Sequence, residues 1–118
     1  MDASNQAGLP ETLPLEIDVD EAAASLRSEE APLLLDVREH SERAFCRIGD
    51  ELHIPIAEIP HRWDFLPRDK HLLVYCHHGM RSLRVTHFLR QAGLPKVQSL
   101  RGGIEAWSLQ IDSSVPRY

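Results

Sequence analysis

The segment that decides the fold reads Leu72-Leu73-Val74-Tyr75-Cys76-His77-His78-Gly79-Met80-Arg81-Ser82. It opens with an apolar run, which is typical of a strand covered on both faces, and the run ends at Cys76. Apolar residues then recur at helical spacing from Val85 to Ala92, before a stop signal formed by Gly93 and Pro95. The segment therefore predicts a buried strand, a short loop and an amphipathic helix.

This strand-to-helix junction is a place where parallel α/β sheets bind ligands. Backbone N–H groups and the positive end of the helix dipole converge there, and both stabilise an anion. The thiolate is the nucleophilic form of cysteine, so the position makes Cys76 a candidate catalyst. The alternative is that Cys76 is an inert buried thiol.

The size and composition of the chain fit one globular domain. Its 118 residues are 42% hydrophobic and 26% charged, which suits a single packed core and excludes a wholly disordered chain. The net charge of −5 argues against a general nucleic-acid binder. We expect neither a signal peptide nor a membrane span, because the start of the chain and its apolar runs lack the required patterns. Cys46 and Cys76 are the only cysteines, and we expect no disulfide between them, a packed thiol at Cys46 and a reducing, cytoplasmic setting.

Strands and helices alternate along the rest of the chain. Besides the strand at 72–75, strands are expected at residues 14–17, 33–35, 52–55 and 96–100, with the strand at 52–55 lying at an edge. Helices are expected at residues 19–28 and 41–46 and after Gly103, with an irregular helical stretch at 57–66. We expect Asp18 to cap the first of these helices together with Glu21. The alternation predicts a mostly parallel sheet with helices on both faces, over a domain at 14–111 between tails at 1–13 and 112–118.

Three separated segments together resemble one known family: Leu34-Leu35-Asp36-Val37-Arg38, Cys76-x-x-Gly79-x-Arg81-Ser82 and Leu100-Arg101-Gly102-Gly103-Ile104-Glu105-Ala106-Trp107. The chain is similar to single-domain rhodanese-like sulfurtransferases. The resemblance implies a three-layer α/β sandwich with a five-stranded, mostly parallel sheet between helices. It also implies an enzyme without a cofactor, in which Cys76 carries a sulfane sulfur as a persulfide. The stretch 46–53 departs from the family pattern and keeps only Ile48 and the start of the later His-Ile-Pro.

The length of the cysteine loop separates sulfur transfer from phosphorus chemistry. Phosphatases and arsenate reductases of the same fold carry an arginine at the position that Ser82 occupies here, whereas Arg81 comes one residue earlier. A tetrahedral oxyanion needs a wider ring of amides than one terminal sulfur atom does. The shorter loop therefore favours sulfur transfer and disfavours these alternatives.

We expect the thiolate of Cys76 to attack the outer sulfur of a donor such as thiosulfate, and the loop to hold the resulting persulfide. The candidate substrate-binding residues are His77, His78, Gly79, Met80, Arg81 and Ser82. A guanidinium matches oxyanions, so Arg81 is a candidate for holding the leaving anion, with a solvated helix-face arginine as the alternative. The two histidines lack a zinc-like ligand pattern and predict no metal. Gly79 is expected where only glycine fits.

Four residues outside the loop are predicted to support it: Asp36, Arg38, Gly102 and Gly103. An ion pair between Asp36 and Arg38 would fix neighbouring strand ends, and we favour this role over a catalytic one. The two glycines would let the last helix begin tightly against the sheet.

The leading hypothesis is a thiosulfate-type sulfurtransferase that uses small sulfur donors and a cyanide, thiol or protein acceptor. The second is a persulfide carrier or sensing module that docks on a protein partner and turns over small molecules poorly. Neither hypothesis involves nucleic acid or a membrane.

Overall fold

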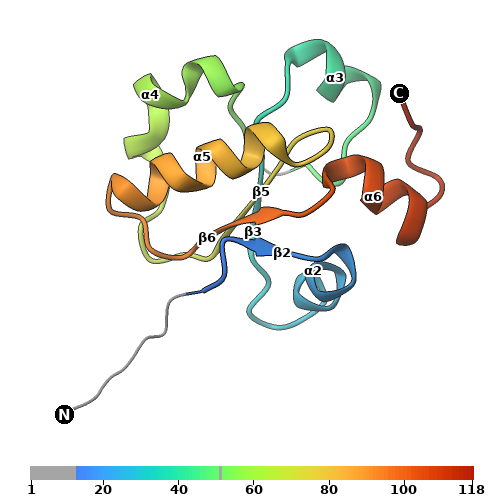
Figure 1. The fold of residues 1–118 in the computed structure, drawn as a ribbon, viewed down its shortest axis with the longest axis horizontal. Coiled ribbons are helices and arrows are strands. Elements are labelled where there is room, and N and C mark those ends of the chain that lie inside the picture. The colour runs from blue at the N-terminus through green and yellow to red at the C-terminus, as the bar shows by residue number, and fades with distance from the viewer. Residues whose placement is uncertain (1–12, 51) are drawn as a thin grey trace.

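The computed structural model describes residues 13–50 and 52–118, so the tail expected at 1–13 lies outside the described residues except for Leu13. Within them the chain forms a five-stranded sheet (Figure 1). Its order is β2 (Glu16–Ile17), β6 (Val97–Leu100), β5 (Leu72–Tyr75), β3 (Leu33–Asp36) and β4 (Leu52–His53). All four neighbouring pairs are parallel, which confirms the predicted sheet and places β4 at an edge.

Helices cover both faces of this sheet. They are α2 (Val19–Leu26), α3 (His40–Phe45), α4 (Ile59–Arg62), α5 (Met80–Gln91) and α6 (Gly103–Gln110), with 3₁₀ turns η1 (Ile56–Glu58) and η2 (Trp63–Phe65) on either side of α4. Figure 1 shows α4 and α5 on one side of the sheet and α2 on the other. Helices on both sides of a parallel sheet confirm the predicted α/β sandwich. In the described part of the chain, no helix has the length and apolar character needed to cross a membrane.

Side chains of the central strand β5 alternate between two cores. Leu73 and Tyr75 pack in the core that includes residues of α2 and α6, whereas Leu72, Val74 and Cys76 belong to the core that includes residues of α4 and α5. Because both faces are buried, the strand reads as a continuous apolar run. Cys76, which directly follows the central strand, therefore packs on the face of the sheet that α5 covers.

The first helix has Asp18 at its N-cap position, as predicted, but the expected side-chain cap bond does not form. The Asp18 carboxylate instead lies 2.8 Å from Nη1 of Arg101. A charged guanidinium is a stronger partner for a carboxylate than a backbone amide is. A comparable bond forms at α3, where the Glu39 N–H donates to Oε1 of Glu42 at 2.8 Å.

Candidate functional site

Cys76 lies at the carboxyl end of the central strand and is 1% exposed. The chain turns into α5 through Gly79, whose φ of 107° lies in the left-handed region. A Cβ atom at Gly79 would also come within 3.2 Å of the Gly102 nitrogen, so the prediction that only glycine fits here is confirmed. Met80 begins the helix and is 76% exposed. The loop thus buries the Cys76 thiol, whereas the Met80 side chain is exposed to solvent.

Two backbone donors and one hydroxyl of the loop contact the Cys76 sulfur. The N–H groups of Gly79 and Ser82 donate to Sγ at 3.1 and 3.3 Å, and the Cys76 thiol donates to the Ser82 hydroxyl oxygen at 3.4 Å. That hydroxyl is also 2.7 Å from the hydroxyl of Ser99 on β6, a residue that no sequence motif singled out. Amide donors at the first turn of a twelve-residue helix stabilise negative charge on the sulfur.

Backbone N–H groups at the start of α6 bind the carbonyl groups of the cysteine loop. The Ile104 N–H donates to the Cys76 carbonyl at 2.9 Å, and the Glu105 N–H donates to the His77 carbonyl at 3.1 Å. Such a close approach requires glycine, because a Cβ atom at Gly103 would lie 2.6 Å from the Cys76 carbonyl oxygen. Gly102 and Gly103 have φ values of 80° and 62°. The predicted tight start of the last helix is confirmed.

Arg81 turns its guanidinium toward Glu42 of α3. Nη1 and Nη2 donate to the two carboxylate oxygens at 2.8 and 2.9 Å. The Arg81 hydrogen bonds lower the pKa of Glu42 to about 2, and Glu42 in turn raises the pKa of Arg81. The Arg81 guanidinium, which we expected to hold the leaving anion, therefore already binds the Glu42 carboxylate.

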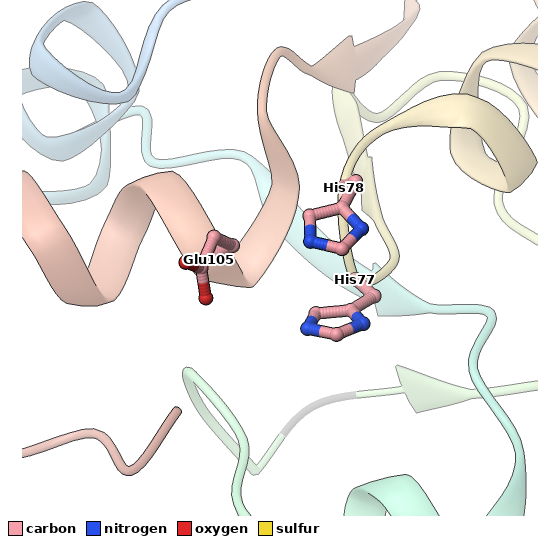
Figure 2. Close-up of side chains that lie close together, drawn as sticks. All are labelled: His77, His78 and Glu105. Atoms are coloured by element: carbon pink, nitrogen blue, oxygen red, sulfur yellow. The ribbon is translucent and has the colours of Figure 1, made fainter. Parts of the chain in front are cut away.

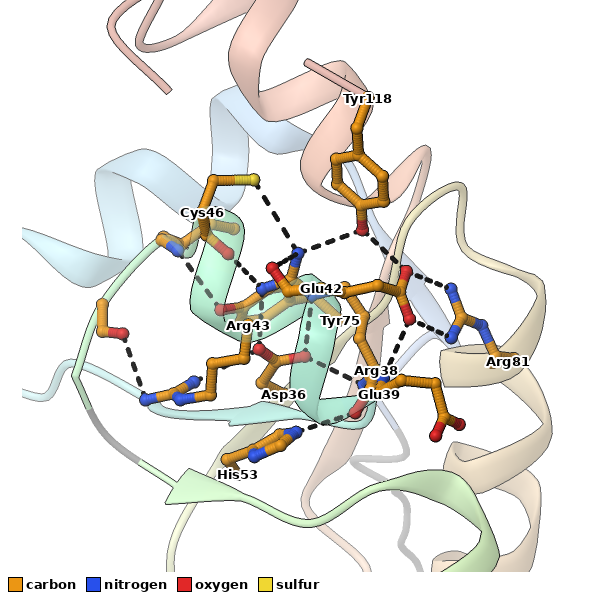
Figure 3. A network of polar contacts seen from close by, with 12 residues as sticks. Asp36, Arg38, Glu39, Glu42, Arg43, Cys46, His53, Tyr75, Arg81 and Tyr118 are labelled. Atoms are coloured by element: carbon orange, nitrogen blue, oxygen red, sulfur yellow. Dashed lines mark hydrogen bonds and ion pairs between the residues drawn. The ribbon is translucent and has the colours of Figure 1, made fainter. Parts of the chain in front are cut away.

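The predicted ion pair between Asp36 and Arg38 is formed, and both side chains are fully buried. Nε and Nη2 of Arg38 donate to the two oxygens of Asp36 at 2.9 and 2.8 Å, and Arg43 adds a contact at 3.2 Å (Figure 3). Burial opposes ionisation, but the Arg38 hydrogen bonds lower the pKa of Asp36. Arg38 also donates to the carbonyl of Cys46 at 2.6 Å. The pair thereby ties the end of β3 to the end of α3.

Tyr118 is a further site residue, besides Glu42 and Ser99, that the sequence analysis missed. Its hydroxyl donates to Oε2 of Glu42 at 2.8 Å and accepts from Nη1 of Arg38 at 3.0 Å (Figure 3). Its ring stacks on His77 with centroids 3.8 Å apart. Residues 112–118 have no apolar period, and an aromatic residue at the end of a polar stretch was the only available signal. The segment predicted as a tail contacts the site.

The histidines form a stack beside the loop. The rings of His77 and His78 lie 3.9 Å apart at 22°, and their ligand atoms lie within 4.8 Å of a Glu105 oxygen (Figure 2). Imidazole lone pairs lie in the ring planes, so nearly parallel rings do not converge on one ion. Arg117 also binds Glu105 at 2.6 Å. Burial, followed by the charge of His78, lowers the pKa of His77 and so disfavours its protonated form.

Comparison with known proteins identifies the family. The Rhodanese-like domain family matches residues 18–110. A sulfurtransferase of Allochromatium vinosum is 39% identical over 93 residues, which are 79% of this chain and 87% of that protein. The thiosulfate sulfurtransferase GlpE of Coxiella burnetii is 33% identical over 75 residues, which are 64% of this chain and 70% of that protein.

A solved structure agrees with these sequence matches. The rhodanese-related protein of Thermoplasma volcanium superposes with a TM-score of 0.76 at 35% identity, and the match covers 83% of this chain and 94% of that chain. The matched region contains β5, the cysteine loop and α6. This chain therefore belongs to the rhodanese-like domain family.

Proposed function

We propose that this protein is a sulfurtransferase in which Cys76 alternates between a thiolate and a persulfide. The observation that carries the proposal is the Cys76 sulfur held by the N–H groups of Gly79 and Ser82 at the start of α5. These donors are placed to stabilise the anionic sulfur both before and after transfer. Family membership and relatives named as sulfurtransferases support the same reaction class.

The reaction has two displacement steps. The Cys76 thiolate attacks the outer sulfur of the donor, the sulfur–sulfur bond of the donor breaks, and the leaving group takes the electron pair; with thiosulfate the leaving group is sulfite. A nucleophilic acceptor such as cyanide or a thiol then attacks the outer sulfur of the persulfide. The second step returns the thiolate, so no external oxidant or reductant is consumed.

Phosphate chemistry is less well supported by the same loop. The two amide contacts to Sγ, at 3.1 and 3.3 Å, enclose a single sulfur atom. The only arginine of the loop binds Glu42 through both of its terminal nitrogens, which leaves that fork unavailable for a tetrahedral oxyanion. We therefore favour sulfur over phosphorus.

A persulfide relay to a protein partner is the second candidate. The exposed side chains of His78 and Met80 border the loop and would contact any protein that approached Cys76. Two free thiols, Cys46 and Cys76, fit a reducing, cytoplasmic setting for either function. Measurable persulfide loading with negligible turnover on small acceptors would favour the relay over the enzyme.

Loading of the cysteine tests the proposal. We expect purified protein to gain one sulfur atom on the Cys76 peptide after treatment with thiosulfate or a small organic persulfide, as measured by mass spectrometry. Cys76→Ser should abolish the adduct and thiocyanate formation from cyanide, whereas the matched variant Cys46→Ser should retain both. Absence of the adduct with every donor would refute the assignment, and efficient hydrolysis of an aryl phosphate would refute the loop argument.

A further inference from the structure

We infer that Glu42 sets the donor preference of this site by withholding Arg81 from anionic donors, so that organic persulfides of low charge are preferred over thiosulfate. The inference rests on the proposed sulfur transfer and adds to it a substrate class and a specificity-determining residue. It follows from how the Glu42 carboxylate is held, from the charges around the loop and from the charges of the two kinds of donor.

The Glu42 carboxylate is fixed by four hydrogen bonds from three residues. Both terminal nitrogens of Arg81 donate to it, the Glu39 N–H donates to Oε1, and the Tyr118 hydroxyl donates to Oε2 at 2.8 Å. The side chain is only 17% exposed, and Arg81 is 29% exposed. With a pKa of about 2, Glu42 is anionic at neutral pH. Turning Arg81 toward a ligand would therefore leave a partly buried carboxylate without its main partner.

Two further arginines near the site, Arg38 and Arg117, are also paired with carboxylates. Arg38 faces Asp36, and Arg117 faces Glu105 at 2.6 Å. Burial lowers the pKa of His77, which disfavours a positive charge on this ring. Arg81 directly precedes Ser82, whose N–H donates to the Cys76 sulfur at 3.3 Å, so this arginine belongs to the reacting loop. Its charge is already balanced by Glu42.

The charge of the donor determines how strongly the neutralisation of Arg81 by Glu42 disfavours its reaction with Cys76. Thiosulfate is a dianion that leaves as sulfite, so its reaction with the Cys76 thiolate gathers three negative charges at the loop. An alkyl persulfide anion reacts as RSS⁻ + CysS⁻ → RS⁻ + CysSS⁻, which gathers one charge fewer and conserves sulfur, electrons and charge. Because Glu42 already neutralises Arg81, this arginine offsets little of the added charge, and the approach of thiosulfate is penalised more strongly.

The test compares two donors on one variant. Glu42→Gln keeps the size of the side chain and removes its charge, which leaves the positive charge of Arg81 uncompensated. We expect the ratio of kcat/KM for thiosulfate to kcat/KM for the persulfide of 2-mercaptoethanol to rise about tenfold, mainly through a lower KM for thiosulfate. The ratio does not depend on the fraction of protein that is folded, so partial destabilisation does not obscure it.

Three further variants locate the effect. Glu39→Gln removes an exposed carboxylate of the same segment that forms no ion pair with Arg81 in the described structure, and it should change the ratio less than twofold. Adding Arg81→Gln to Glu42→Gln should abolish the gain. Glu42→Met, which keeps the length of the side chain, should shift the ratio in the same direction as Glu42→Gln.

The inference and the proposed function fail in different ways. An unchanged ratio in both Glu42 variants, with Cys76 still loaded, would refute the role of Glu42 and leave sulfur transfer intact. An equal gain in Glu39→Gln would reduce the effect to net charge and would also refute it. Failure of every donor to load wild-type Cys76 would instead refute the proposed function.

Discussion

Replacing Gly103 by alanine tests whether the start of α6 builds the cysteine loop. At this position φ is 62°, and an added Cβ would meet the carbonyl groups of Cys76 and His77, both of which belong to backbone that cannot simply swing away. These carbonyl oxygens accept the N–H groups of Ile104 and Glu105 at 2.9 and 3.1 Å. The substitution therefore forces the helix away from the loop and weakens both hydrogen bonds.

The expected cost follows from those contacts. A left-handed backbone conformation costs a residue with a side chain about 1–2 kcal/mol. Losing two partly or fully buried hydrogen bonds adds about 1 kcal/mol each, so Gly103→Ala should lower the free energy of unfolding by about 3–4 kcal/mol. Gly93→Ala is the matched control, because its φ is 110° but its Cβ would meet only the flexible end of Arg68 at 3.2 Å. Only the conformational cost of about 1–2 kcal/mol applies there.

Two measurements separate the variants. Urea unfolding should show the larger loss for Gly103→Ala, and the rate of persulfide loading, corrected for the folded fraction, should fall at least about tenfold in Gly103→Ala and stay unchanged in Gly93→Ala. The tenfold figure reflects the sensitivity of a nucleophile to small displacements of its loop. Equal stabilities, or normal loading by folded Gly103→Ala, would refute the claim that α6 positions Cys76.

Three further outcomes are expected. Asp36→Asn should lower the free energy of unfolding by about 3–5 kcal/mol in urea titrations, because it leaves the fully buried Arg38 guanidinium without a charged partner. Ser82→Ala should slow sulfur loading of Cys76 several-fold while preserving the fold, because it removes a hydroxyl 3.4 Å from Sγ; unchanged loading rates would contradict this. Since the pKa of Glu42 falls from 4.5 to about 2 in the folded state, its contribution to stability is present above pH 4.5 and is lost as the pH falls toward 2. Acid titration of Glu42→Gln should lack that loss.

Sequence patterns predicted the parts of this protein that local rules determine. The apolar run at 72–75 is a strand because both of its faces meet a core, and the glycines at the start of α6 are required by their φ values. Pairings between distant side chains were not predictable in this way. Arg81 and Glu42 are 39 positions apart, and Tyr118 is 76 positions from Glu42. No periodicity links such residues, because their contact is created by the sheet order.

The buried pair of Asp36 and Arg38 explains how the distant contacts are held in place. A buried ion pair is weak evidence for stability, since desolvation of two charges offsets much of their attraction. Arg38, however, does more than bind Asp36 on β3: it also donates to the Cys46 carbonyl at the end of α3 and to the Tyr118 hydroxyl. One guanidinium thus fixes three segments that converge on Glu42. An apolar replacement of equal volume could fill the core but could not orient these segments, and so the pair is better explained by the placement of the Glu42 carboxylate than by stability alone.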